Sequence, residues 1–191
     1  TGGVPLLYAQ NDSGNVEDLT IGGNNVIFKA GSGSTGSEIA RISENGGITF
    51  NGDTAAANGL DDYEEGTFTP VLENDGSTTY TTQIGRYVKI GSLVHVDAFI
   101  QINNEDGSSA LVTGIENMPF TNGSGLTVTF PIGANGGWDS NMTSTNFIGW
   151  FPNGTTTARF YKNNGGNLNP ITVDDIGSSG EIAVTITYRA A

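Results

Sequence analysis

The sequence predicts an all-β protein in which a segment of short strands precedes an antiparallel β-sandwich or jelly-roll-like domain. Gly supplies 29 of the 191 residues, about twice its average share. Asn and Thr are also abundant, a mixture that favours strands and tight turns over helices. Up to residue 58 the apolar runs are very short. From Thr67 onward they lengthen and alternate with polar residues, as strands with one buried face do.

The first segment, residues 1–58, consists of apolar runs separated by turns rich in Gly, Asn and Ser. The runs are "LTI" (19–21), "VIF" (26–28), "EIARI" (38–42) and "ITF" (48–50). Isolated hairpins of such short strands are marginally stable in water. We therefore expect other molecules to cover these strands, and copies of the same chain are the simplest cover.

The stretch "TAAANGLDDYEEG" (54–66) has the one locally helix-compatible composition of the chain, and Asn58-Gly59 interrupts it. We expect a turn or a single helical turn here. Residues 59–66 are interpreted as a linker that joins the first segment to a second domain, residues 67–191.

The second domain begins with "TFTPVLE", where Pro70 indicates an edge strand or a bulge. Two strands follow within 78–102, and the Ile90-Gly91-Ser92 connection predicts a hairpin. Further strands are expected in "ALVTGI", in "LTVTFPIG", and in a hairpin that turns at Pro152-Asn153-Gly154. Two strands show clear alternation of apolar residues: Val94, Val96, Ala98, Ile100 and Ile102 in one, and Ile182, Val184, Ile186 and Tyr188 in the last.

Charge and composition exclude several classes of function. Lys and Arg total 7 against 20 Asp and Glu, a net charge of -13, so phosphate backbones and anionic membranes repel the chain. For this reason we expect no nucleic-acid partner. We also expect no membrane insertion, because no apolar run approaches about 18 residues. Cys is absent, which excludes thiol chemistry and Cys-based metal sites. The chain starts at Thr1 without Met, and we interpret it as a fragment or processed product.

Two stretches resemble the distal parts of bacteriophage tail fibre and tail spike proteins. They are "EIARISENGGITFNGDTAAANGLDDYEEGTFTPVL" and "YTTQIGRYVKIGSLVHVDAFIQI", which together cover residues 38 to 102. The resemblance implies an elongated homotrimer, with residues 1–58 as an intertwined shaft segment and the later domain as a head that contacts the host surface. It implies a location at the distal tip of the fibre in the virion.

In that setting "LDDYEEGTFTPVL" is the joint between shaft and head. Its four acids, Asp61, Asp62, Glu64 and Glu65, would repel one another in a trimer. We expect them to point outward, to pair with Arg41, Arg86 or Lys89, or to bind a cation. Tyr63 and Phe68 are expected to be buried anchors at the joint.

Candidate catalytic and metal-binding groups are weakly supported. His95 is the one His, and it shares a strand face with Asp97, but no nucleophile motif accompanies the pair. Paired carboxylates that could hydrolyse glycosides exist among Asp61, Asp62, Glu64, Glu65, Glu105, Asp106, Asp174 and Asp175. "NNEDG" (103–107) offers oxygen ligands for Ca²⁺ but lacks EF-hand spacing. We expect no enzymatic activity, no cofactor and no resident metal.

A cluster rich in aromatic and amide side chains is the favoured binding site. Sugars present apolar C–H faces and hydroxyl rims, which aromatic plates and amides recognise. The candidate glycan-binding residues are Trp138, Asp139, Asn141, Asn153, Tyr161 and Asn163. Trp150 alternates with Ile148 and is expected in the core.

The sequence therefore predicts a phage tail fibre tip that attaches the virion to bacterial surface polysaccharide or lipopolysaccharide. Two alternatives stay open. One is a tail spike fragment that degrades polysaccharide, and the other is a structural virion fibre or connector that binds nothing.

Overall fold

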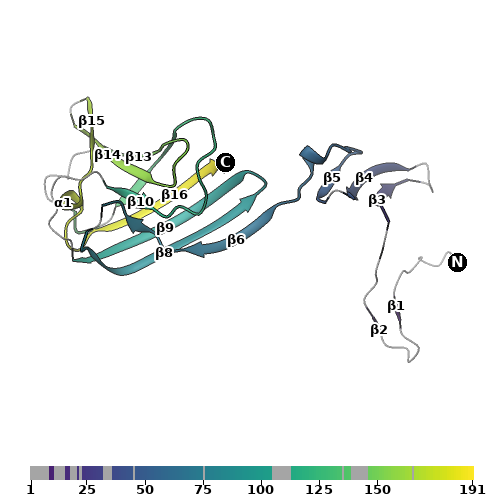
Figure 1. Cartoon of the computed structure of the whole chain (residues 1–191), viewed down its shortest axis with the longest axis horizontal. Coiled ribbons are helices and arrows are strands. Elements are labelled where there is room, and N and C mark those ends of the chain that lie inside the picture. Colours follow the sequence, from purple (N-terminus) through teal and green to yellow (C-terminus); the bar gives the residue numbers. More distant parts are fainter. Residues whose placement is uncertain are drawn as a thin grey trace. The chain divides into compact units, whose positions relative to one another are not determined.

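The computed structural model describes residues 9–10, 16–17, 21, 23–31, 36–44, 46–74, 76–104, 113–134, 136–138, 146–164 and 166–191. The chain divides into two compact units, residues 1–61 and 62–191, which are described separately (Figure 1). The architecture is nearly all β, as the sequence predicts, and the strand pairs in the described ranges are antiparallel. In those ranges no helix is both long enough and apolar enough to cross a membrane.

The first unit contains a two-stranded ladder, β1 (Ala9–Gln10) with β2 (Val16–Glu17), and a three-stranded sheet. The sheet is formed by β3 (Val26–Ala30), β4 (Ser37–Ile42) and β5 (Ile48–Phe50). The predicted runs at 26–28, 38–42 and 48–50 are thus confirmed as strands, whereas most of the run at 19–21 lies outside the described residues. The expected single helical turn is the 3₁₀ helix η2 (Ala56–Asn58).

One face of this three-stranded sheet is entirely apolar. Residues directly opposite each other on paired strands share a face, and the register forms two such rows: Val26, Ile42 and Ile48, then Phe28, Ala40 and Phe50. Four of these side chains are 40–55% exposed: Ile48, Ile42, Phe28 and Phe50. We call these six residues the apolar face of β3–β5.

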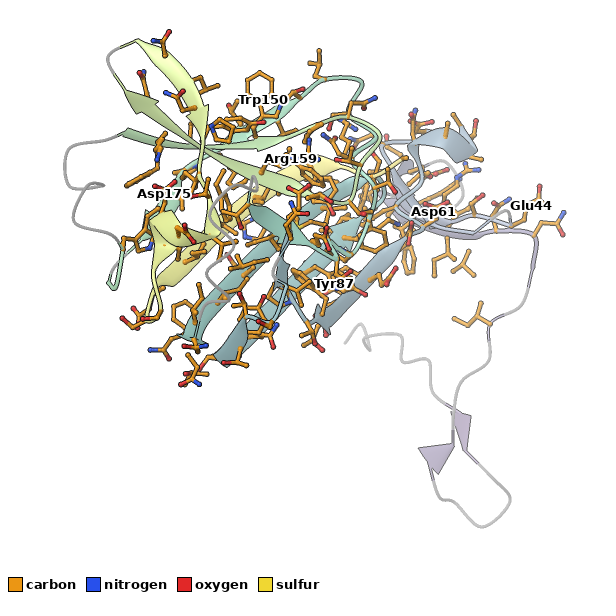
Figure 2. All side chains as sticks on the ribbon, turned by 60° about the vertical axis from the view of Figure 1, so that its left-hand side comes forward. Glu44, Asp61, Tyr87, Trp150, Arg159 and Asp175 are labelled. Atoms are coloured by element: carbon orange, nitrogen blue, oxygen red, sulfur yellow. The ribbon has the colours of Figure 1, made fainter. Side chains whose placement is uncertain are left out.

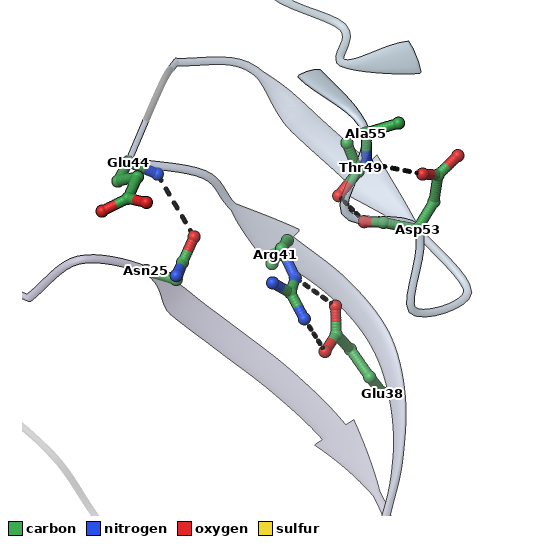
Figure 3. Close-up of polar contacts among 7 residues, drawn as sticks. All are labelled: Asn25, Glu38, Arg41, Glu44, Thr49, Asp53 and Ala55. Atoms are coloured by element: carbon green, nitrogen blue, oxygen red, sulfur yellow. Dashed lines mark hydrogen bonds and ion pairs between the residues drawn. The ribbon is translucent and has the colours of Figure 1, made fainter. Parts of the chain in front are cut away.

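The other face of the sheet is mixed, because Ile27, 42% exposed, lies in register with Arg41, and the chain itself covers part of this face (Figure 3). Arg41 donates two hydrogen bonds to the Glu38 carboxylate, each 2.6 Å long. The Thr49 hydroxyl, 2% exposed as a residue, donates to the Asp53 carbonyl at 2.7 Å. The Asp53 carboxylate in turn accepts from the Ala55 N–H at 2.8 Å. The segment after β5 therefore folds over this second face, and the described residues leave the apolar face of β3–β5 exposed.

The second unit is a sandwich of two antiparallel sheets (Figure 1). The five-stranded sheet has the order β12 (Ile132–Ala134), β16 (Glu181–Arg189), β9 (Leu93–Asn104), β8 (Thr79–Ile90), β6 (Tyr63–Phe68). The six-stranded sheet has the order β11 (Val128–Phe130), β13 (Asn146–Phe151), β14 (Ala158–Asn164), β10 (Gly114–Glu116), β7 (Val71–Leu72), and β15 (Asn167–Pro170) also pairs with β14. The helix α1 (Val173–Ile176) connects β15 to β16.

The chain changes sheets at prolines on both edges of the sandwich. At one edge β6 ends and β7 begins around Pro70, and at the other Pro131 separates β11 from β12. Proline lacks an N–H group, so it suits positions where the ladder of hydrogen bonds is interrupted. The stretch "LTVTFPIG" is therefore two strands in two sheets and not the single strand that the sequence predicted.

The core lies between the sheets. All nine predicted alternating residues of β9 and β16 are confirmed as buried, with at most 4% of each exposed. The opposing sheet contributes Leu72, Ile115, Phe151 and Phe160, and the rings of Phe151 and Tyr188 meet edge to face at 4.9 Å between centroids. Phe130 lies over Gly149, where a Cβ atom would stand 2.1 Å from the ring. Because residue 149 is glycine, the Phe130 ring can pack directly against the backbone of β13 at this point of the core.

The joint differs in part from the expectation. Strand β6 starts at Tyr63 and pairs with β8, so residues 63–66 belong to the sandwich and not to a linker. Asp62 forms the expected ion pair with Lys89, and Glu64 accepts a 2.6 Å hydrogen bond from the Tyr87 hydroxyl. Phe68 packs against the core as predicted, whereas Tyr63 is 64% exposed, so it is not a buried anchor within the single chain. It lies on the outer side of an edge strand.

Candidate functional site

The outer side of the six-stranded sheet carries a group of aromatic and aliphatic residues. On β13, Phe147 and Phe151 face the core, so Ile148 and Trp150 face outward. The register places Ile148 opposite Tyr161, Tyr161 opposite Pro170, and Asn163 opposite Leu168. We call this the outer aromatic surface, formed by Ile148, Trp150, Tyr161, Leu168 and Pro170.

Trp150 has the largest aromatic side chain of this surface. It is 36% exposed, and its ring meets that of Tyr161 at 6.1 Å between centroids with an interplanar angle of 63°. Figure 2 shows Trp150 at one surface of the sandwich, with Tyr87 on the other sheet. The edge contact fixes the orientation of the indole while part of its surface stays open to solvent. The expectation that Trp150 is a core residue is therefore wrong.

A charged pair borders the aromatic rings. Arg159 lies opposite Trp150 in the register, and its Nε and Nη2 groups donate to the Glu73 carboxylate at 2.8–3.1 Å. Glu73 is 8% exposed, whereas the Arg159 side chain is 42% exposed. The hydrogen bonds that Arg159 donates to the Glu73 carboxylate raise the pKa of Arg159, so the guanidinium stays charged. Among described residues Nη1 has no hydrogen-bond partner, which leaves its N–H groups oriented and available to a ligand.

A cavity of about 390 Å³ adjoins the same surface and is lined by Thr129, Phe130, Pro131, Phe147, Ile148, Asn163 and Leu168. Its position follows from the sheet change at Pro131. Strand β11 pairs with Gly149–Phe151 and then leaves the sheet, so the earlier residues of β13 have no β11 neighbour. The volume lies within the usual range for small-ligand sites, about 300–1,000 Å³.

Two of the predicted binding residues are brought together on this surface. Tyr161 contacts Trp150, and Asn163 lines the cavity. The Asn163 side-chain oxygen accepts from the Gly166 N–H at 3.1 Å, whereas its amide N–H₂ has no partner among the described residues. The amide can therefore donate to a ligand hydroxyl group.

The remaining predicted residues lie elsewhere or outside the described ranges. Trp138 is half-buried, packs against Phe147 at 4.8 Å, and donates its indole N–H to the Glu181 carbonyl at 2.9 Å. That arrangement is a structural clamp between the sheets. Asn153 sits in the turn after β13, where its side-chain oxygen accepts from the Gly125 N–H at 2.8 Å. Asp139 and Asn141 lie outside the described residues.

His95 and Asp97 lie on the outer side of the five-stranded sheet. The His95 Nε2 atom is 3.7 Å from the Asp97 carboxylate, and Nδ1 is 3.0 Å from the Thr187 hydroxyl. The order hydroxyl, imidazole, carboxylate is that of a catalytic triad. The side chains of His95 and Asp97 are 50% and 61% exposed, however, and the surrounding N–H groups are used by the β9–β16 ladder. The backbone of these strands therefore offers no pair of free N–H donors for an oxyanion, and we assign no catalytic role to this exposed pair.

Four of the acidic candidates, Asp62, Glu64, Glu65 and Asp175, are engaged as structural partners, whereas the Asp174 Oδ1 atom is buried without a hydrogen-bond partner among the described residues. Asp175 binds Lys162 at 2.7 Å, and Glu65 accepts from the Tyr63 hydroxyl at 2.7 Å. Glu105, Asp106 and the rest of "NNEDG" after Asn104 lie outside the described residues. Within the described ranges no three His, Asp or Glu side chains gather as a metal site would require.

Fold and surface together define an antiparallel β-sandwich with an exposed aromatic surface, preceded by a unit of short strands. A comparison with protein-family models finds no match for the chain, and a comparison with curated proteins finds none either. Sequence reasoning missed Trp150 and the Arg159–Glu73 pair. The signal that could have found Trp150 is the competing parity in "FIGWF", where Phe147 and Phe151 are as suited to the core as Ile148 and Trp150 are.

Proposed function

We propose that the chain is the distal tip of a phage tail fibre, a homotrimer that attaches the virion to a bacterial surface by binding glycan without cutting it. The resemblance of residues 38–102 to tail fibre and tail spike proteins supports the virion location. The outer aromatic surface supports glycan as the ligand.

The observation that carries the ligand class is the oriented Trp150 ring with polar donors around it. An indole held edge-on by Tyr161 offers an apolar plate to the C–H face of a sugar ring. The Arg159 guanidinium, in register with Trp150, supplies hydrogen-bond donors beside that plate for sugar hydroxyls, and the Asn163 amide supplies another in the adjoining cavity. A few fixed polar groups around an apolar surface are what a site needs for orientation and specificity.

The apolar face of β3–β5 supports the assembly of several copies. Burying a large apolar side chain completely contributes about 1.5–3 kcal/mol, and Phe28, Ile42, Ile48 and Phe50 are each about half exposed. Covering the four is therefore worth roughly 4 kcal/mol per chain. Copies of the chain supply that cover symmetrically, and three copies present three glycan sites on one particle. Linked sites bind a repetitive surface more tightly than one site does, by roughly 10²–10⁴-fold.

The function is tested by adsorption of the labelled protein to cells. We expect the 191-residue protein to adsorb to host cells and not to non-host cells, and purified host surface polysaccharide to compete. Failure to adsorb to any host strain would instead support a structural connector. Release of reducing ends from the polysaccharide during incubation would support the degrading tail spike and would contradict the proposal.

A further inference from the structure

The outer side of the five-stranded sheet is a second surface that the described residues of the second unit leave exposed. Its residues form rows across the strands, because residues in register share a face. Three neighbours in one end row are apolar and exposed, Tyr63, Ile90 and Leu93 at 64%, 43% and 48%, and Arg189 completes that row on β16. Near the other end, Ile84, 46% exposed, lies in register with Phe99, and Phe99 with Ala183. We call the surface formed by these rows the outer face of the five-stranded sheet.

Polar residues occupy the rows between these two apolar bands. Arg86 lies opposite Asp97, and Asp97 lies opposite Thr185, whose hydroxyl donates to it at 2.7 Å. The guanidinium of Arg86 has no carboxylate or other side-chain partner among the described residues. An arginine left unpaired between apolar bands, in a chain with 20 acidic residues, is suited to a carboxylate from another molecule.

We propose that this face packs against other copies of the same chain, so that the heads as well as the shaft segments associate. The proposal rests on the homotrimer of the proposed function and extends it to a surface in the second unit.

Charge favours a second copy as the occupant. The chain carries a net charge of -13, so two copies repel each other except where a surface is close to neutral. On this face the charged side chains are Glu65, Arg86, Asp97, Glu181 and Arg189. Two of the seven basic residues thus stand beside three of the twenty acids. Each copy also offers both signs, which lets Arg86 of one chain meet an acid of another.

The size of the face fits an interface between subunits. Its five strands contain 6, 12, 12, 9 and 3 residues. At about 3.3 Å per residue and about 4.8 Å between strands they span roughly 650 Å² before the relief of the side chains is counted. A standard interface buries about 800 Å² on each partner. A hollow of about 700 Å³, lined by residues that include Ile84, Arg86, Phe99 and Thr185, gives the face a concavity that a neighbouring copy can fill.

Chain connectivity lowers the cost of this contact. Residue 61 ends the first unit and residue 62 begins the second. Once the apolar faces of β3–β5 assemble, the attached heads are held together at an effective concentration in the millimolar range. A face that is too small to drive association alone then becomes sufficient.

The test uses single cysteines, because the natural chain has none. Ile84→Cys places a thiol on the outer face of the five-stranded sheet, and Leu126→Cys, at a residue that is 72% exposed, places one in the loop before β11. In the assembled full-length protein we expect maleimide to label Ile84→Cys at least tenfold more slowly than Leu126→Cys. In urea, where the assembly has dissociated, the two rates should agree.

A second cysteine position on the same face checks that slow labelling is not a property of residue 84 alone. Thr185→Cys, on the same face, should be shielded to a similar degree. The preparation contains only this chain, so shielding that is lost in Phe50→Glu, a variant that separates the copies, identifies copies as the cover. Equal labelling of all three thiols in a three-chain particle would overturn the inference and leave the trimer standing. A single-chain mass would overturn both. Host adsorption plays no part in either readout, so loss of glycan binding cannot imitate these results.

Discussion

The ring of Trp150 meets Tyr161 edge-on across the neighbouring strands β13 and β14, with 6.1 Å between the ring centroids. The contact turns an exposed tryptophan into a fixed platform on the outer aromatic surface. Sugar binding on such a platform depends on the ring itself, which leads to the first prediction.

Trp150→Ala should weaken binding of host polysaccharide about tenfold per site, equivalent to about 1.4 kcal/mol, because the apolar plate is lost. Trp150→Phe should retain part of the affinity. Calorimetric titration with oligosaccharides from the host surface measures both. The matched control is Trp138→Phe, which removes the hydrogen bond to the Glu181 carbonyl and should lower stability while leaving affinity unchanged. Affinity that follows Trp138 and ignores Trp150 would place the site elsewhere.

The Arg159–Glu73 pair should respond asymmetrically to substitution. Arg159→Ala leaves the carboxylate of Glu73, 8% exposed, buried without its cation, at a cost of about 3 kcal/mol. Glu73→Gln leaves Arg159, 42% exposed as a side chain, in reach of water, and should cost about 1 kcal/mol. Thermal unfolding of the two variants checks the order. Equal losses would mean that Glu73 reaches solvent.

Asp175 should contribute stability that disappears in acid. Burial raises its pKa, but hydrogen bonds from Lys162 and from Thr172 outweigh burial and hold the pKa below its usual value. The contribution is therefore complete above the unfolded pKa, about 3.9, and is lost as pH falls through the lower folded value. Asp175→Asn should unfold at a lower temperature than the wild type at neutral pH. The gap should narrow as the pH falls below about 4. A gap independent of pH would contradict the ion pair.

Tyr188 should contribute stability that is lost as the pH rises into the alkaline range. Burial raises the pKa of Tyr188 to about 12, and its hydroxyl donates to the Phe120 carbonyl at 3.0 Å. An unfolded tyrosine ionises near pH 10. The stabilisation is thus complete below about pH 10 and is lost as pH rises toward about 12. Tyr188→Phe keeps the ring in the core and should weaken the dependence of the unfolding free energy on pH between about 10 and 12. An unchanged alkaline slope would show that other groups cause it.

The strands were predictable where one parity is apolar and the other polar. In Val94–Ile102 and Ile182–Tyr188 the alternation decides which side chains face the core, and the structure buries those residues. In "FIGWF" both parities are apolar, so periodicity cannot select the buried side. The structure selects it through packing: Phe130 covers Gly149, which leaves Trp150 outside.

Elements that depend on distant partners were not predictable from local pattern. Pro131 splits one apolar run between two sheets, a choice made by the edges of the sandwich. The sequence predicts Tyr63 as an anchor beside acidic residues, but the alternation of β6 that places Phe68 against the core turns Tyr63 to the outer side. The short strand β15 and helix α1 were missed as well, although Thr172 and Asp175 form a capping box that marks the start of the helix.

The central claim is that the first unit lacks a self-sufficient interior, because the apolar face of β3–β5 needs copies of the chain to cover it. Native mass spectrometry of the 191-residue protein tests this directly. The account predicts a particle of about 59 kDa, three times the chain mass of 19.8 kDa, and a shift toward single chains in Phe50→Glu but not in the control Leu126→Glu. A wild-type protein that remains at 19.8 kDa across the micromolar range would contradict the account.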